Sequence, residues 1–426
     1  MRGWSCWIVG AFLVALVPGC YGIRVSVHTP PRPAYKSIAR PSLPADDLEL
    51  SGLQRAAQAS LSYLRRADDT ASYTLANDVY TPDQIAHSVE HFARLVDETP
   101  PSRLQDRLAR ECHGYRPNQG AHFTAYYEPV LSGSRFPDGR YRYPLYKMPD
   151  GLTLVRLARF FPGDSRRFHG QVRDGELMPF LTRQQIDGER MLEKRGLELA
   201  WVDDPVALYF LHIQGSGRVH LPDGQVMRVN YAANNGYSYT SVGRYMLDHN
   251  LIQSGSSSSI RSYLQGNPDT RDQILFQNKR YIFFREVELD SDQGPIGSLG
   301  VPLIAGRSIA ADSRYVPPGA VLYIKTQAPV VDSQGQIAGW NSMGRFVFHH
   351  DSGAAIKGPG RADIYWGEGD RAGSAAGYMN RRGDMIVLMC GVEPLRHAKG
   401  SDSAAFSRVA LPQVVETLAS AARSGL

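Results

Sequence analysis

The stretch FVFHHDSGAAIKGPGRADIYWGEGDRAGSAAGYM, residues 346–379, decides the expected fold. It opens with an aromatic and β-branched run that ends in Asp351, and a glycine-rich turn carrying Lys357 follows. Asp363 then stands at the head of a second short strand over 364–366. Glycine loses the most backbone entropy on ordering, so this many glycines indicate a chain held in unusual conformations. Carboxylates at such a place suggest a functional site.

A third carboxylate lies upstream in GVPLIAGRSIAADSRYVPPG, residues 300–319. Asp312 precedes a Pro-Pro-Gly turn, and another strand is predicted over 321–325. Strands are expected to dominate from residue 281 to about residue 390.

The size and charge of the chain limit its class. It has 426 residues, of which 42% are hydrophobic and 21% charged. This length is too great for one ordinary core, and the composition argues against wholesale disorder. The net charge of +5 is spread without a dense Lys/Arg stripe, so no nucleic-acid partner is expected.

The N-terminus is typical of a secretory signal: Arg2 precedes an apolar run over 4–18, and small residues lead to Cys20. The run is shorter than a membrane-spanning helix requires. Its end resembles a bacterial lipoprotein box, which implies that Cys20 is acylated and holds the chain to a membrane. Tyr21 after the Cys implies the outer membrane, facing the periplasm. The alternative is a conventional signal peptide with an incidental Cys.

Two further cysteines, Cys112 and Cys390, lie in the body of the chain. An oxidising periplasm would permit a disulfide between them. Two unpaired buried thiols are at least as good an interpretation. No C-x-x-C pair is present, which excludes a zinc ribbon or a redox motif.

Residues 48–112 read as helices, with a capping box from Thr81 to Gln84 and an apolar face after it. From 122 to 146 the pattern changes to alternating strands with glycine turns. Further strands are predicted at 208–213 and 226–231. Short helices are predicted near residues 182, 240 and 258, and one at 411–422.

Several short blocks occur in order along the chain: TAYYEP at 124–129, YPLY at 143–146, IQGSG at 213–217, NYAANNGYSY at 230–239 and YIFF at 281–284. With the three aspartate segments, they resemble the membrane-bound lytic transglycosylase A family over roughly residues 115–393. The aspartate segments resemble its three-aspartate domain, a double-psi β-barrel. Ala125 stands where the family has Gly, a conservative change.

The resemblance implies a mainly β protein with accessory helices, in which a double-psi β-barrel domain is interrupted by a second β-rich domain. We expect a glycan groove between the two, and the N-terminal helices packed on the barrel domain. The expected parts are a lipoprotein signal peptide at 1–20, a Pro-rich tether at 21–47, N-terminal helices and the first part of the barrel domain at 48–129, an inserted β-rich domain at 130–284, the double-psi β-barrel catalytic domain at 285–394 and a C-terminal tail at 395–426.

The family cleaves the β-1,4 bond between N-acetylmuramic acid and N-acetylglucosamine in peptidoglycan without adding water, leaving 1,6-anhydromuramyl ends. The Asp-Ile-Tyr motif makes Asp363 the expected catalytic residue. Glycosidic cleavage normally uses two carboxylates, one of which activates water. If the C6 hydroxyl of the sugar attacks instead, one carboxylate suffices, first as acid and then as base. Its pKa must then be raised. From the residues alone, a turn-capping role for Asp363 is the better interpretation, and the resemblance favours catalysis.

Other side chains are candidates for supporting or substrate-binding roles. Asp351 is expected to support the active site. Lys357 binds a substrate carbonyl or carboxylate, or pairs with Asp351. Asp312 stabilises its turn or contacts substrate. Further candidates, each with a structural hydrogen bond or core packing as the alternative, are Thr124, Tyr126, Tyr127, Gln214, Ser216 and Tyr365.

Glu128 is the rival acid, because it follows two tyrosines on a predicted strand. A hydrolase using Asp363 and Glu128 as a pair is therefore the second hypothesis. A glycan-binding module without catalysis is the third, because fold alone does not fix function.

Two patterns are set aside. His349-His350-Asp351 suggests a metal site, but neighbouring side chains on a strand point to opposite faces. Gly367-x-Gly369-x-x-Ala372 mimics a dinucleotide fingerprint without the surrounding βαβ pattern. No metal and no cofactor are expected.

Overall fold

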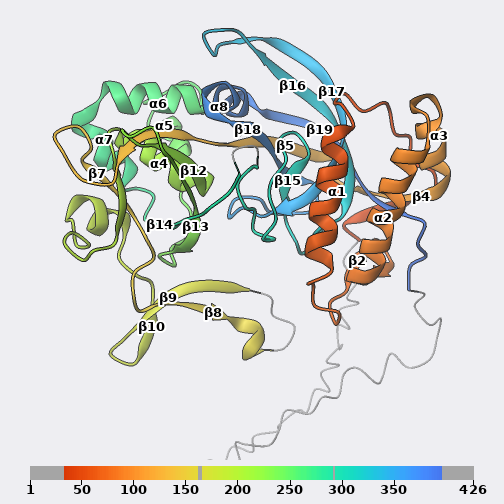
Figure 1. The fold of residues 1–426 in the computed structure, drawn as a ribbon, viewed down its shortest axis with the longest axis horizontal. Coiled ribbons are helices and arrows are strands. Elements are labelled where there is room, and N and C mark those ends of the chain that lie inside the picture. The colour runs from red at the N-terminus through yellow and green to blue at the C-terminus, as the bar shows by residue number, and fades with distance from the viewer. Residues whose placement is uncertain (1–32, 162–165, 291–292, 396–426) are drawn as a thin grey trace, which may run out of the picture. The chain divides into compact units, whose positions relative to one another are not determined.

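The computed structural model describes residues 33–161, 166–290 and 293–395 (Figure 1). Cys20, most of the expected tether and the expected helix at 411–422 lie outside the described residues. No helix within these ranges is long and apolar enough to cross a membrane.

A closed ring of six strands carries the aspartates. Its order is β19–β16–β17–β15–β18–β5, and β5 pairs back onto β19. The bounds are β5 Ala121–Glu128, β15 Ser308–Ala311, β16 Val321–Val331, β17 Ile337–Asp351, β18 Arg361–Glu368 and β19 Asn380–Cys390. Only β5 precedes the insertion, and the other five strands follow it. The predicted interrupted double-psi β-barrel is confirmed.

The inserted part contains a second sheet of order β14–β13–β12–β6–β11–β7 and a smaller one of order β10–β9–β8. The strands are β6 Val130–Ser134, β7 Tyr143–Tyr146, β8 Leu152–Arg156, β9 Arg167–Arg173, β10 Glu176–Met178, β11 Glu198–Val202, β12 Ser216–His220, β13 Val226–Asn234 and β14 Ile282–Glu286. Helical elements are η1 Leu157–Arg159, η2 Gln184–Gly188, α4 Pro205–Gln214, α5 Val242–Asp248, α6 Ser257–Gly266 and α7 Pro268–Leu275. The strand at 226–231 and the helical turns near 182, 240 and 258 are confirmed.

The strand predicted at 208–213 is wrong, because this segment belongs to helix α4. Asp204 caps the helix by accepting a hydrogen bond from the Val206 N–H, Pro205 starts it, and Gly215 ends it with φ of 81°. The helix is buried on most sides, so its sequence is apolar without a helical period. Such a run cannot be told from a buried strand by periodicity.

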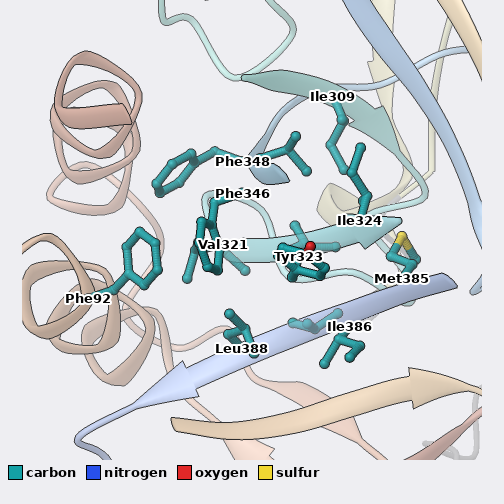
Figure 2. Close-up of a cluster of buried hydrophobic side chains, with 14 of the residues drawn as sticks. Phe92, Ile309, Val321, Tyr323, Ile324, Phe346, Phe348, Met385, Ile386 and Leu388 are labelled. Carbon is teal, nitrogen blue, oxygen red and sulfur yellow. The ribbon is translucent and has the colours of Figure 1, made fainter. Parts of the chain in front are cut away.

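The N-terminal helices α1 Ser51–Leu64, α2 Pro82–Glu98 and α3 Pro101–Glu111 pack on the barrel, as predicted. The capping box at Thr81 is formed with Gln84. Figure 2 shows Phe92 of α2 facing Phe346 and Phe348, and its ring centroid lies 5.0 Å from that of Phe346. A short hairpin of β2 Tyr73–Leu75 and β3 Asp78–Tyr80 interrupts the helices.

Residues 33–47, expected to extend as a tether, instead lie against the barrel. β1 Tyr35–Ile38 pairs with β4 Cys112–Pro117, which pairs with β19. Asp46 forms an ion pair with the buried Arg307, and Asp47 one with Arg345. The prolines predicted an extended tether, but composition does not reveal ion pairs between residues far apart in the sequence.

Helix α8, Gly369–Tyr378, lies inside the region where strands are predicted to dominate. The glycines that mimic a dinucleotide fingerprint turn β18 into this helix: Gly367 has φ of 113° and Gly369 φ of 75°. These left-handed values favour glycine for purely conformational reasons.

Candidate active site

Four side chains lie in one row across adjacent strands of the barrel. Ala310 of β15 pairs with Asp351 of β17 on one side and with Asp363 of β18 on the other, and Asp363 pairs with Thr124 of β5. Paired residues present their side chains on the same face of a sheet. Neighbouring strands are about 4.8 Å apart, so the Cα atoms of the two aspartates are separated by roughly 10 Å.

The alternation of β18 explains why Asp363 faces the site. Ala362 and Ile364 are fully buried in the main core, and Asp363 and Tyr365 point to the other face. Asp363 remains partly exposed there. The strand therefore gives one carboxyl group both a fixed backbone and access to solvent.

The Thr124 hydroxyl donates a short hydrogen bond to Oδ1 of Asp363, and Nη2 of Arg361 donates to the same hydroxyl at 2.7 Å. Burial raises the pKa of Asp363 above its ordinary value, and the negative charge of Asp351 adds to the rise. The hydrogen bond from Thr124 and the charge of Arg361 oppose this rise without reversing it. A raised pKa keeps more of the carboxyl protonated, as a general acid requires.

Asp351 is held by three donors. The backbone N–H groups of Ser298 and Ser352 each donate at 2.8 Å, and the Tyr126 hydroxyl donates at 3.0 Å. Burial nevertheless raises the pKa of Asp351. This carboxyl is fixed in place, which suits the expected supporting role.

Two of the candidate tyrosines form the apolar side of the site. The Tyr126 and Tyr365 rings lie 5.5 Å apart, and they pack in a small buried cluster with Leu303, Ala310 and Ile356. The pKa of Tyr126 is raised well above its ordinary value by burial and by Asp351, so its hydroxyl stays protonated and donates.

Asp312 lies away from the row, and its contacts favour the turn-stabilising role. It pairs with Arg314 and accepts a hydrogen bond of 2.9 Å from the Gly358 N–H. Burial acts to raise the pKa of Asp312, but the hydrogen bonds from Arg314 and Gly358 outweigh it and lower the pKa to about 2. Asp312 therefore anchors the glycine-rich turn. Lys357 of that turn is exposed, and among the described residues no ion pair joins it to Asp351.

Glu128, the rival acid, is almost fully buried and held by two arginines. Nε of Arg218 lies 3.0 Å from its Oε2, and Nη2 of Arg228 lies 3.2 Å from its Oε1. Arg218 also pairs with Glu368. Both carboxyl oxygens of Glu128 are therefore occupied by arginine side chains.

Three further candidates lie on strand β5 or in the inserted part, and two of them, Tyr127 and Gln214, connect the two. The side-chain oxygen of Gln214 accepts a hydrogen bond of 3.1 Å from the Tyr127 N–H, and Arg261 donates to the Tyr127 hydroxyl at 3.0 Å. Ser216 is buried in β12, paired with Asn230 of β13. These contacts favour the structural alternatives for Tyr127, Gln214 and Ser216.

Sequence reasoning missed Arg361 and Ser298. Arg361 stands two residues before Asp363, and the alternation of a strand would have placed both on one face. Ser298 reaches Asp351 through its backbone N–H, which leaves no signal in the side-chain pattern.

The two adjacent histidines have separate partners. Both ring nitrogens of His350 contact serine hydroxyls, Ser60 at 2.9 Å and Ser308 at 2.8 Å. His349 faces the carbonyl oxygens of Val316 and Pro317. Among the described residues, no group of three or more His, Cys, Asp or Glu side chains could hold a metal ion.

Known proteins match both parts of the chain. A family model described as the MltA specific insert domain matches residues 122–285, and one described as the 3D domain matches residues 307–389. Membrane-bound lytic murein transglycosylase A of Escherichia coli K12 is 26% identical over 309 residues, which cover 71% of this chain and 75% of that protein.

Solved structures agree with these matches. The crystal structure of a membrane-bound lytic murein transglycosylase from Agrobacterium tumefaciens is 31% identical, with a TM-score of 0.66, covering 81% of this chain and 93% of that one. MltA from Neisseria gonorrhoeae is 28% identical with a TM-score of 0.59, covering 85% and 94%. The chain belongs to the membrane-bound lytic murein transglycosylase A family.

Proposed function

We propose that this protein is a lytic transglycosylase that cleaves the β-1,4 bond between N-acetylmuramic acid and N-acetylglucosamine in peptidoglycan and leaves 1,6-anhydromuramyl ends. Asp363 is the catalytic residue, first as acid and then as base. The observation that carries the proposal is the carboxyl group of Asp363, which is partly exposed and has a raised pKa. The other carboxyl group in its row, that of Asp351, is occupied by three hydrogen-bond donors.

The reaction needs one proton to move in each direction. Protonated Asp363 gives its proton to the glycosidic oxygen as that bond breaks, and positive charge develops on the muramyl ring. The ionised carboxylate then accepts the proton of the C6 hydroxyl while this oxygen bonds to the anomeric carbon. The hydrogen bond from Thr124 and the charge of Arg361 stabilise the ionised form between the two steps. Intramolecular attack gains from proximity.

A hydrolase using Glu128 is less well supported. Asp363 pairs with Thr124 of β5, and Glu128 lies four residues further along that strand. At 3.3 Å per residue, the Cα atoms of Thr124 and Glu128 are roughly 13 Å apart, so Glu128 is at least as far from Asp363. Paired carboxyl groups of glycosidases stand about 5–9.5 Å apart. The two arginines on Glu128 also restrain it from turning toward the row.

The same proposal places the protein at a membrane. Acylation of Cys20 would anchor it to the outer membrane, facing the peptidoglycan of the periplasm. The glycan strand would lie in a groove between the barrel and the inserted part, with Asp363 on its floor.

Mass spectrometry of digested peptidoglycan tests the function. The protein starting at Tyr21 is compared with Asp363→Asn, which keeps the shape of the side chain, and with Asp384→Asn, which makes the same change at an exposed position of β19. We expect anhydromuropeptides from the native protein and from Asp384→Asn, and at least a thousandfold less from Asp363→Asn. Reducing ends formed with water would contradict the proposal and favour Glu128. Anhydro products at an undiminished rate from Asp363→Asn would remove Asp363 from its role.

A further inference from the structure

A basic cavity lies next to the acid, and of its charged lining residues the mechanism above uses Arg361 alone. Its volume is about 740 Å³, and its lining includes Lys357, Arg361, Arg381, Arg382 and His122. No carboxylate lines it. Such a cavity is suited to an anionic ligand.

The strand register fixes where this cavity stands relative to Asp363. Arg361 of β18 pairs with His122 of β5, and His122 pairs with Arg382 of β19. These three residues form a second row across the barrel. Arg361 stands two residues before Asp363 on β18, and His122 stands two residues before Thr124 on β5. Two residues along a strand return to the same face after roughly 7 Å. The basic row therefore stands beside the acid row on one face.

Among the charges of the cavity, that of Arg361 interacts with the nearby Asp363 carboxyl group. In the described part of the chain, Lys357, Arg361, Arg381 and Arg382 form no salt bridge. Arg361 is occupied by the Ala362 carbonyl oxygen and the Thr124 hydroxyl, and Arg381 stacks on Trp340 with its guanidinium carbon 3.6 Å from the ring centroid. Nε of Arg381 is buried without a hydrogen-bond partner. Arg382 is exposed at the rim.

We propose that this cavity binds a free carboxylate carried by the C3 substituent of the muramic acid whose bond is cleaved. This inference rests on the proposed function and specifies its substrate. The C3 substituent leaves the sugar within one ring's length of the cleaved bond, which matches the spacing of the two rows. Arginine guanidinium groups bind carboxylates through paired hydrogen bonds, and Arg382 at the rim of the cavity is suited to such a contact.

Two sources can supply the carboxylate: the stem peptide, or the lactyl group of strands from which the peptide has been removed. In either case the protein distinguishes strands by this charge. A neutral chitin-like oligomer would lack the contact.

The test uses soluble glycan oligomers in three forms: with stem peptides, with the peptides removed to leave the lactyl carboxylate, and with stem peptides whose carboxylates are converted to methylamides. The native protein is compared with Arg382→Gln, and with Arg103→Gln as a control for the loss of one exposed charge on α3, away from the cavity. Binding to an Asp363→Asn background is measured by calorimetry, and kcat and KM are measured on the active forms.

We expect the native protein to bind at least one free-carboxylate form about tenfold more tightly than the methylamide form, since charge-assisted hydrogen bonds are the strong ones. Arg382→Gln should remove most of this preference by raising KM with little change in kcat, and it should leave the methylamide form unaffected. Arg103→Gln should behave like the native protein. Preference for peptide-bearing or for stripped strands then identifies the source.

Equal affinity of the native protein for all three forms would overturn the inference, as would an equal loss on all three in Arg382→Gln. If no form yields anhydro products, the proposed function fails, yet the calorimetric comparison still decides whether the cavity binds carboxylates. An exposed residue at the rim is suited to this test because its substitution leaves the core untouched.

Discussion

At the scale of single residues, the chemistry depends on how the neighbours of Asp363 set its proton affinity. Burial and the charge of Asp351 raise its pKa, while Thr124 and Arg361 lower it. The acid must be protonated before the reaction and ionised halfway through it. These opposed influences on one pKa suit a carboxyl group that acts first as acid and then as base.

The pH profile of kcat/KM tests this balance. Activity needs protonated Asp363, so it should fall as the pH rises through the raised pKa of Asp363. Asp351→Asn removes a charge that raises this pKa, so the alkaline limb should move to lower pH. Thr124→Val removes a donor that lowers it, so the limb should move to higher pH. Asp384→Asn is the control, and shifts of both variants in one direction would contradict the assignment.

At the scale of elements, the turn from β18 into α8 brings a helix against β5. A Cβ atom added at Gly373 of α8 would lie 2.7 Å from the Tyr127 ring. Tyr127 is held by Arg261 and, through its backbone N–H, by Gln214, so its ring has little freedom to move. Gly373 therefore permits the close approach of α8 to the strand that carries Thr124.

Gly373→Ala separates packing from helix propensity. Alanine favours a helix over glycine by about 0.5–1 kcal/mol, so a stabilising effect follows if propensity dominates. We expect instead a loss of about 1–3 kcal/mol in the free energy of unfolding, because the side chain is forced into Tyr127. Gly266→Ala in α6, where no atom lies within 4 Å of the added Cβ, is the control and should not destabilise the protein. Urea unfolding gives both values, and equal effects of the two changes would be inconsistent with the close packing of α8.

At the scale of the whole molecule, a covalent bond joins distant segments. Cys112 at the end of the helical region and Cys390 in β19 pair directly across two antiparallel strands and form a disulfide over 278 residues of chain. Of the two interpretations left open by the sequence, the disulfide is the one found. It links β4, and through it β1, to a strand of the closed ring.

Removing this disulfide should lower stability more than activity, because neither cysteine lies in the row that contains Asp363. We expect Cys112→Ala with Cys390→Ala to lose about 2–4 kcal/mol in the free energy of unfolding, through the larger freedom of the unfolded chain. A reductant should lower the urea midpoint of the native protein and leave that of the double variant unchanged. An unchanged midpoint for the native protein would mean that the bond contributes nothing to stability.

The sequence by itself determined the features that depend on neighbouring residues. The alternation of β18 sends Ala362 and Ile364 to the core and Asp363 to the site, and the capping box at Thr81 starts α2. Ordered blocks identified the family and the interrupted barrel. The strand alternation and the helix start follow from local periodicity and capping, whereas the family and the barrel were implied by the resemblance of the ordered blocks.

Only the tertiary structure decided which groups surround the acid. Thr124 meets Asp363 across 239 residues, and Glu128 meets Arg228 across 100. The apolar run at 208–213 became a helix because its surroundings bury it from most sides, which removes the period that would reveal it. Such pairings arise when the strands of the ring close in one register, and a register is set by the packing of the whole barrel rather than by any single strand.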